Sequence, residues 1–171
     1  MKVPFNKEML FGEEKEALIL ALQQGKMYGD GPFTKKCHQF FESEESGYNV
    51  KKALLTSSCT MAFEMAFILS EIGFDDEVIM PSFGYPSAAS SLIVHGGVPV
   101  FVDINPKTLC IDENLIEASI TEKTKAIFVV HYAGISCDMD KVMDIASKHG
   151  LRVIEDAAQA IMVNMSEEWR E

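Results

Sequence analysis

The sequence predicts an α/β fold with a mostly parallel sheet flanked by helices. Short apolar runs alternate with helical patterns along most of the chain, and each connection between two expected strands contains helical sequence. Several of the helical patterns also stop at a glycine, as helices commonly do. Parallel strands need such crossover connections, whereas antiparallel strands can be joined by tight turns.

The elements can be assigned in order along the chain. Two helical patterns come first, at 6–26 and 34–44, and GDGPF at 29–33 between them is expected to be a turn. The five expected strands lie at 51–56, 76–82, 98–105, 125–132 and 151–156. The helices that alternate with them are expected at 58–73, 85–97, 112–120 and 138–150. We therefore expect an N-terminal helical segment over 1–50 and the sheet-containing part of a larger domain over 51–162.

Bulk composition limits the classes of function. The chain has 171 residues and a net charge of −11, which argues against nucleic-acid binding as its main task. Its longest apolar runs, such as 126–130, are far short of a membrane span, and residues 1–10 lack the apolar stretch of a signal peptide. The four cysteines are widely separated, without metal-ligand spacing, as in reduced cytosolic proteins. We expect a cytoplasmic protein with no metal and no membrane or nucleic-acid partner.

Candidate ligand-binding residues follow the expected strands, because ligands of open α/β sheets bind at the carboxyl ends of strands. SSCTM after the first strand opens a helix, whose N-terminal amides suit a phosphate, although hydroxyl residues there also serve as ordinary caps. Phe83 and Tyr85 follow the second strand and could stack on a flat ring or simply pack the loop. His131 follows the fourth strand and could contact a ligand or be structural.

Asp156 ends the last strand in RVIEDAAQAI. A carboxylate at the tip of a buried strand is costly without a partner, so a protonated ring nitrogen or a magnesium ion would suit it, and a structural role is also open. A phosphate cradle, a stacking aromatic and an acid for a ring nitrogen are together the parts that hold pyridoxal phosphate.

Five segments in this order resemble the DegT/StrS family of pyridoxal-phosphate-dependent sugar-nucleotide aminotransferases. They are SSCTMAFEMA, EVIMPSFGYPSAAS, GGVPVFVDINPKTLCID, VVHYAG and VIEDAAQ, and the similarity runs from about Val3 to about Met162. The resemblance implies fold type I, of which this chain would be the N-terminal part of the large domain. It implies pyridoxal 5'-phosphate as cofactor, a dTDP-4-keto-6-deoxyhexose and an amino-acid donor such as glutamate as substrates, and a homodimer.

The resemblance also implies roles for individual residues. The cofactor phosphate would bind backbone amides of Thr60 and Met61 in a cradle that includes Ser58 and Cys59. Tyr85 would stack on the pyridine ring.

Asp156 would pair with the ring nitrogen and keep the ring an electron sink, and Gln159 would contact the ring hydroxyl. Gly29, Asp30 and His131 would contact the substrate.

The Schiff-base lysine of the family lies downstream of EDAAQ, in a segment that resembles nothing in this chain. After Met162 the sequence reads VNMSEEWRE, a tail over 163–171 that departs from the family, and the last lysine is Lys148. That lysine moves the proton between carbons, so the 171 residues alone are expected to be inactive as a transaminase.

Other readings stay open. The family includes sugar dehydratases, in which a histidine replaces the lysine, and transaminases that act at carbon 3. A non-catalytic chain that assembles with a full-length subunit is also compatible, and a magnesium-dependent phosphotransfer domain using Asp103 and Asp156 fits the strand ends less well.

Overall fold

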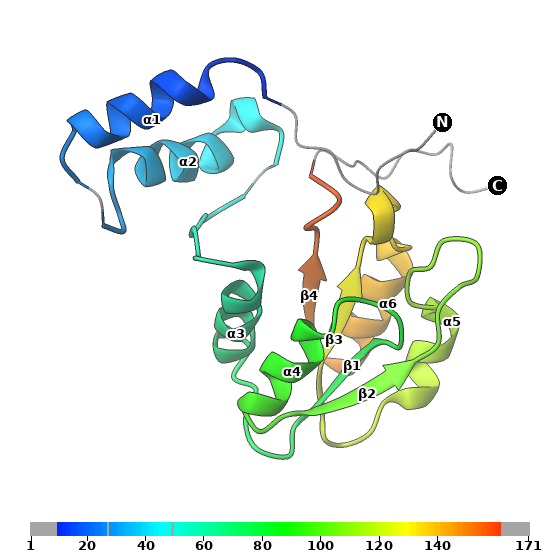
Figure 1. Cartoon of the computed structure of the whole chain (residues 1–171). Coiled ribbons are helices and arrows are strands. Elements are labelled where there is room, and N and C mark those ends of the chain that lie inside the picture. Colours follow the sequence, from blue (N-terminus) through cyan, green and yellow to red (C-terminus); the bar gives the residue numbers. More distant parts are fainter. Residues whose placement is uncertain (1–9, 27, 49, 162–171) are drawn as a thin grey trace. The chain divides into compact units, whose positions relative to one another are not determined.

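The structure is a computed structural model in which residues 10–26, 28–48 and 50–161 are described (Figure 1). The chain divides into two compact units, Met1–Leu55 and Thr56–Glu171. The tail at 163–171 lies outside the described residues.

The first unit is helical. It contains α1 (Glu14–Gln23), α2 (Pro32–Glu42) and the short 3-10 helix η1 (Glu44–Ser46). The turn expected at 29–33 is cut short because Pro32 already begins α2. Proline suits the first helical position, since its fixed φ is helical and its missing N–H would have no partner there.

The strand expected at 51–56 is wrong. The amides of Ala53 and Leu55 donate to side chains of α2, at 3.0 Å to Glu42 Oε1 and 3.1 Å to His38 Nε2. These alternate amides are the donors that a strand would present to one neighbour. Lys52 adds an ion pair with Glu42 at 2.8 Å, so the segment is held by α2 as an extended linker.

The second unit confirms the predicted α/β fold. Its sheet contains β1 (Glu77–Pro81), β2 (Val98–Val102), β3 (Thr124–Val130) and β4 (Arg152–Asp156). All pairs are parallel, in the order β2-β1-β3-β4. The helices are α3 (Cys59–Leu69), α4 (Ser87–Val94), α5 (Glu113–Ile116) and α6 (Met139–His149). The helix expected over 112–120 continues after α5 as the 3-10 helix η2 (Glu117–Ser119), and η3 (Tyr132–Gly134) follows β3.

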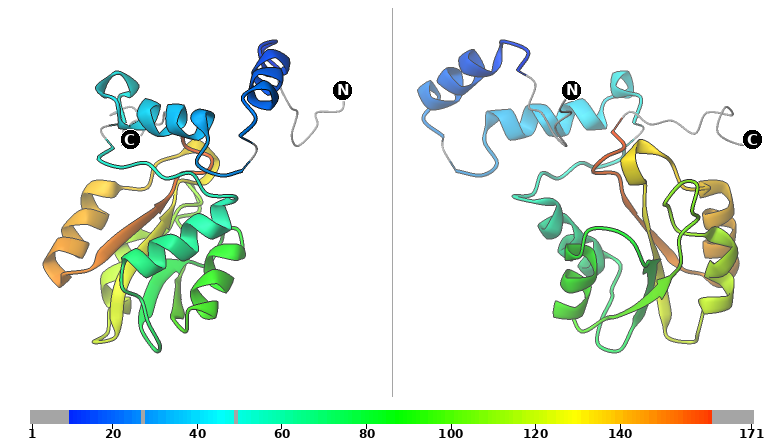
Figure 2. Two further views of the ribbon diagram at one scale, coloured as in Figure 1. Left: turned by 90° about the vertical axis from the view of Figure 1, so that its left-hand side faces the viewer. Right: turned by 45° about the vertical axis from the view of Figure 1, so that its right-hand side comes forward.

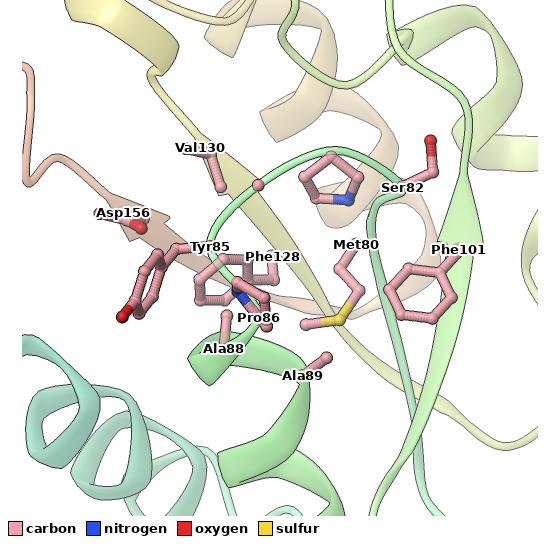
Figure 3. A pocket seen from close by; sticks show the side chains of 12 residues that line it. Met80, Ser82, Tyr85, Pro86, Ala88, Ala89, Phe101, Phe128, Val130 and Asp156 are labelled. Carbon is pink, nitrogen blue, oxygen red and sulfur yellow. The ribbon is translucent and has the colours of Figure 1, made fainter. Parts of the chain in front are cut away.

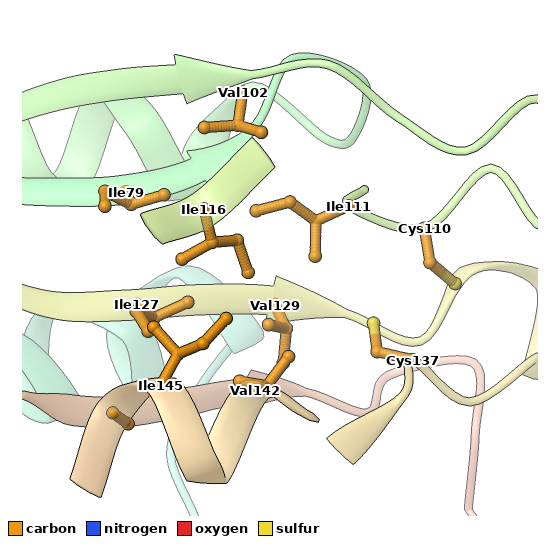
Figure 4. Packing of buried hydrophobic residues seen from close by; sticks show 11 residues of the cluster. Ile79, Val102, Cys110, Ile111, Ile116, Ile127, Val129, Cys137, Val142 and Ile145 are labelled. Atoms are coloured by element: carbon orange, nitrogen blue, oxygen red, sulfur yellow. The ribbon is translucent and has the colours of Figure 1, made fainter. Parts of the chain in front are cut away.

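Helices cover both faces of the sheet, α3 and α4 on one face and α5 and α6 on the other (Figures 1 and 2). Alternate strand residues point to opposite faces, so each face has its own core. Under α3 and α4, Phe67 and Phe128 are buried with Leu92. Against α5 and α6 lies an aliphatic cluster that also contains Cys110 and Cys137 (Figure 4). Within the described part of the chain, no helix is long and apolar enough to span a membrane.

Gly97 offers a test of how tightly α4 packs on the sheet. An added Cβ would lie 2.4 Å from Cδ1 of Leu92 and 3.2 Å from Cγ2 of Ile72. Leu92 is fully buried and cannot retreat. Gly97→Ala should therefore lower the free energy of unfolding by about 2 kcal/mol, measured by urea denaturation.

Gly73→Ala is the matched control, because a Cβ there meets nothing closer than 3.7 Å and the backbone has no positive φ. Equal stability of the two variants would contradict the tight packing.

Candidate functional site

The candidate site lies where the direction of sheet assembly reverses. From β1 the chain passes through α4 to the edge strand β2, and it then returns to the other side of β1 as β3. The connections that follow β1 and β3 therefore lead to opposite edges of the sheet, through α4 to β2 and through α6 to β4. The carboxyl ends of β1 and β3 border a crevice between these two connections. Ser82 follows β1 at this crevice, and Val130 ends β3.

A cavity of about 230 Å³ occupies this position (Figure 3). It faces α4 and is lined by residues of all four strands, the loop after β1 and the start of α4. The lining residues are Met80, Pro81, Ser82, Gly84, Tyr85, Pro86, Ala88, Ala89, Phe101, Phe128, Val130 and Asp156. An apolar cavity with a few polar groups is the usual form of a small-molecule site.

Asp156 is the charged residue of this lining. Its Oδ1 accepts a hydrogen bond from the Ala158 amide at 3.0 Å, which fixes the strand end as a tight Asp turn. Among the described residues, no lysine, arginine or histidine forms an ion pair with it. The half-buried carboxylate can therefore accept a cationic donor from a ligand in the cavity.

Tyr85 supplies an aromatic face beside this carboxylate. It lies in the loop between β1 and α4, and the residue is 77% exposed. Figure 3 shows Tyr85 and Asp156 at one end of the cavity, with Met80 and Phe101 at the other. A ring that pairs with Asp156 can therefore lie near Tyr85. Phe83, the other candidate in this loop, instead contacts the Tyr132 ring at a centroid distance of 4.9 Å.

The N-terminus of α3 is the second polar part of the site. Ser58 is its cap, and Ser58 Oγ accepts a hydrogen bond from the Met61 amide at 3.2 Å. Thr56 Oγ1 donates to the Ser58 carbonyl at 2.8 Å and fixes the turn before the helix. Within the described part of the chain, the amides of Cys59 and Thr60 have no hydrogen-bond partner. These two amides can bind an anion, whereas the predicted Met61 amide is already used by the cap.

The pKa of Cys59 links this helix end to Asp156. Burial raises the pKa of the Cys59 thiol, and the negative charge of Asp156 raises it further. The first residue of α3 thus lies within electrostatic range of the strand-end carboxylate. The thiol stays protonated at neutral pH and adds no negative charge to the helix N-terminus.

The structure places the remaining predicted residues elsewhere. Gln159 Oε1 accepts a hydrogen bond from the Ala133 amide at 2.8 Å, and this side chain is not part of the cavity lining. His131 is buried with both ring nitrogens bonded, to Glu155 and to the Cys137 amide, and it does not line the cavity either. Gly29 and Asp30 belong to the first unit.

Sequence reasoning missed the apolar part of the lining. Met80, Phe101 and Phe128 shape the cavity but lie within strands, where an apolar residue indicates only burial. Glu155 was also missed, although the alternation of strand residues places it on the face opposite to Asp156.

A profile of the DegT/DnrJ/EryC1/StrS aminotransferase family matches residues 10–168. The chain belongs to this family. Among curated relatives, it is 38% identical over 159 residues to the spore coat polysaccharide biosynthesis protein SpsC of Bacillus subtilis. The aligned residues make up 93% of this chain and 40% of SpsC. It is 43% identical over 122 residues to the GDP-perosamine synthase of Caulobacter vibrioides, with 71% and 33% covered. The chain thus spans 40% or less of the length of these two relatives.

Among solved structures, NtdA from Bacillus subtilis with its bound cofactor PMP is similar at a TM-score of 0.79 and 36% identity. This match covers 91% of the chain and 35% of NtdA. The fold is that of the pyridoxal-phosphate-dependent aminotransferases, and pyridoxal phosphate, of which PMP is the amine form, is the cofactor of the DegT/DnrJ/EryC1/StrS family.

The site residues fit this cofactor. Its three recognisable parts are an anion, a flat ring and a ring nitrogen that becomes positively charged. The unpaired α3 amides, the exposed Tyr85 ring and the Asp156 carboxylate match these parts in chemistry, and they lie at the same edge of the sheet.

The effect of Asp156 on Cys59 is open to a direct test. In a Cys37→Ser background Cys59 is the exposed cysteine among the described residues. Adding Asp156→Asn removes a negative charge that raises the thiol pKa, so the pH midpoint of iodoacetamide alkylation should move to lower pH.

Asp103→Asn is the control, because Asp103 also follows a strand but has no effect on the Cys59 pKa. If Asp156→Asn left the alkylation midpoint unchanged, α3 would not begin beside Asp156.

Proposed function

We propose that this chain provides the cofactor-binding part of a sugar-nucleotide aminotransferase. In this role it takes part in moving an amino group from an amino acid, with glutamate as the expected donor, to a dTDP-4-keto-6-deoxyhexose for cell-surface polysaccharide biosynthesis. The specific activity proposed is that of dTDP-4-amino-4,6-dideoxygalactose transaminase, of the enterobacterial common antigen type. The observation that carries the proposal is the joint placement of Tyr85 and Asp156 in one cavity at the strand ends.

The proposed mechanism assigns one task to each group. Asp156 accepts a hydrogen bond from the ring nitrogen and holds its positive charge, since an opposite charge at hydrogen-bond distance favours the ionised form. Tyr85 lies against the ring face and limits its tilt. The amides of Cys59 and Thr60 bind the phosphate with the help of the helix dipole. When bound, the cofactor supplies an electron sink for the carbanion left by loss of the substrate α-proton.

Gln159 and Ser58 act through position. Ser58 caps α3 and keeps its first turn in the geometry that presents the two amides. Gln159 is tied through its oxygen to Ala133, so its amide NH2 group is what it can offer to the predicted ring hydroxyl. A homodimer is the expected assembly, with Gly29 and Asp30 as the proposed substrate contacts.

The names of two relatives bear on which nucleotide the sugar substrate carries. One relative is named as a GDP-perosamine synthase and another as a spore coat polysaccharide protein. The second name fits a sugar for a surface polysaccharide, but the first points to GDP where dTDP is proposed. Competition between dTDP and GDP for binding separates the two nucleotides.

Three further functions remain as alternatives. A sugar dehydratase would use the same cofactor site with a histidine in place of the lysine, and a 3-aminotransferase would use it to act at carbon 3. A non-catalytic chain would instead bind a full-length subunit, and its signature would be assembly with that subunit without turnover.

Binding of pyridoxal 5'-phosphate is the first test. The 171-residue chain should bind it reversibly, measured by equilibrium dialysis and by the absorbance of the bound ring. Asp156→Asn should raise Kd about tenfold, because a charge-assisted hydrogen bond is replaced by a neutral one.

Asp103→Asn serves as the control, since Asp103 does not line the cavity. Pyridoxal without the phosphate should bind more weakly than the phosphate ester. Equal Kd values for the chain and Asp156→Asn would argue against the assigned pairing.

Catalytic turnover is the second test. We expect that none of the lysines in the 171 residues occupies the family's Schiff-base position, and among the described residues no lysine lines the cavity. The purified chain should therefore produce no amino sugar from glutamate and a dTDP-4-keto-6-deoxyhexose above the rate with free cofactor, measured by chromatography. Catalysed turnover would show that another residue here moves the proton.

A further inference from the structure

His131 makes three hydrogen bonds that join the ends of β3 and β4. Its amide donates to the Asp156 carbonyl at 3.0 Å, and its Nε2 lies 3.0 Å from Glu155 Oε2. Its Nδ1 accepts from the Cys137 amide at 3.2 Å. The imidazole is buried, whereas the Glu155 side chain is half exposed. One residue thus contacts both acids of the EDAAQ segment, Asp156 through the backbone and Glu155 through its ring.

The hydrogen-bond pattern defines the roles of the two ring nitrogens. Because Nδ1 accepts from an amide, the proton of the neutral ring is on Nε2 and is donated to Glu155. This hydrogen bond lowers the pKa of the Glu155 carboxyl, so Glu155 is ionised at neutral pH. The result is a directional contact between a buried ring and a carboxylate.

Glu155 and Asp156 point to opposite faces of β4. Successive strand side chains alternate, and Asp156 faces the cavity beside α4 while Glu155 meets His131 on the other face. Cys137, whose amide holds the ring, belongs to the core on that other face (Figure 4). A contact that holds the Glu155 side chain on one face therefore limits the rotation of the strand end. It thereby also sets the direction of the Asp156 side chain on the other face.

The end of β4 has few other supports. Among the residues that the structure describes, β4 pairs only with β3, and Val130 and Asp156 are the last pair in that register. Beyond this pair, the His131 amide makes the last backbone hydrogen bond between the two strand ends. The Asp156–Ala158 and Gln159–Ala133 hydrogen bonds hold the turn after the strand, and the side-chain contact with Glu155 is the one that restrains the strand end from the face opposite to the cavity.

We propose that His131 and Glu155 are positioning residues that hold the Asp156 carboxylate toward the cofactor ring from the opposite face of the sheet. This inference rests on the proposed function, because the task of Asp156 comes from it. In place of the predicted substrate contact, His131 acts through Glu155 and the strand backbone. Neither residue touches the ligand, and their loss changes the direction of Asp156 and leaves its chemistry intact.

A second carboxylate–histidine contact in the molecule serves as a control for the contact between Glu155 and His131. Glu117 Oε1 lies 2.9 Å from His149 Nε2, on the same side of the sheet, and Glu117 also contacts Lys148. The chemistry is the same, but neither residue adjoins the end of β4 or the cavity. Glu117→Ala therefore controls for loss of a carboxylate–histidine contact as such.

The experiment compares Glu155→Ala, Glu155→Gln and Glu117→Ala with the unsubstituted 171-residue chain. The first readout is Kd for pyridoxal 5'-phosphate. The second is the pH midpoint of the absorbance change of the bound ring, which reports how strongly Asp156 holds the ring-nitrogen proton. The third, made without ligand, is amide hydrogen exchange at His131 and Ala158, whose amides donate to Asp156.

Glu155→Ala should raise Kd about tenfold, as loss of an outer-shell partner commonly does. It should also lower the pH midpoint by about one unit, because a misdirected carboxylate stabilises the charged nitrogen less. Exchange at His131 and Ala158 should accelerate about tenfold, while Glu117→Ala leaves all three readouts unchanged. Glu155→Gln keeps an oxygen that accepts from His131, so it should restore Kd to within about threefold of the unsubstituted chain.

The failures of the two proposals are distinguishable. If the unsubstituted chain binds the cofactor and Glu155→Ala has the same Kd and pH midpoint, the positioning role is overturned and the proposed function stands. If the unsubstituted chain binds no cofactor, the proposed function is overturned for this chain. The exchange rates then decide the positioning role alone, and unchanged protection of His131 and Ala158 in Glu155→Ala overturns it.

Discussion

The parallel register between β3 and β4 is the constraint on which the site depends. It pairs Val130 with Asp156 and so brings both strand ends to one edge of the sheet. Because side chains alternate along β4, Asp156 enters the cavity only when Glu155 points away from it. A shift of one residue would exchange the two acids, placing Glu155 in the cavity and Asp156 against His131. The buried pattern of β4, in which Ile154 faces the same core as Phe128, opposes that shift.

Local electrostatics explain how an acidic chain can offer an anion site. The net charge is −11, so the long-range field disfavours a phosphate. At the start of α3, however, two amides point outward and the helix dipole is positive. Cys59 stays a neutral thiol there because burial and Asp156 both raise its pKa. The site therefore depends on keeping nearby groups uncharged as well as on the amides themselves.

The α/β fold could be predicted from the sequence, because the sequence patterns of β1, β3 and α3 agree with the way these elements pack in the structure. The β-branched run at 125–132 gives β3, and Ser58 caps α3 as expected. KKALLT looked like a strand but is not one, since its outcome depended on Glu42 and His38 of α2, which pattern reasoning cannot place. Local propensity is a weak guide wherever distant side chains compete for backbone donors.

The candidate site was predictable to the extent that it lies at strand ends. Asp156 and Tyr85 line one cavity, as their positions after strands indicated. His131 also follows a strand, but its ring is bonded to Glu155 and to the amide of Cys137, which follows the turn at η3, where Ala133 has a positive φ of 53°. A single residue in the left-handed region changes the direction of the chain, and the sequence gives no warning when that residue is alanine.

Holding a cofactor and moving protons are separate tasks, and the described residues are suited to the first. Among them, the titratable groups that line the cavity are Tyr85 and Asp156. In the proposed function Asp156 pairs with the ring nitrogen through its negative charge, and a carboxylate used in this way is not also the base that accepts the substrate proton. Tyr85 is assigned to the ring face. A transaminase built on this cavity therefore needs a further base from outside its described lining.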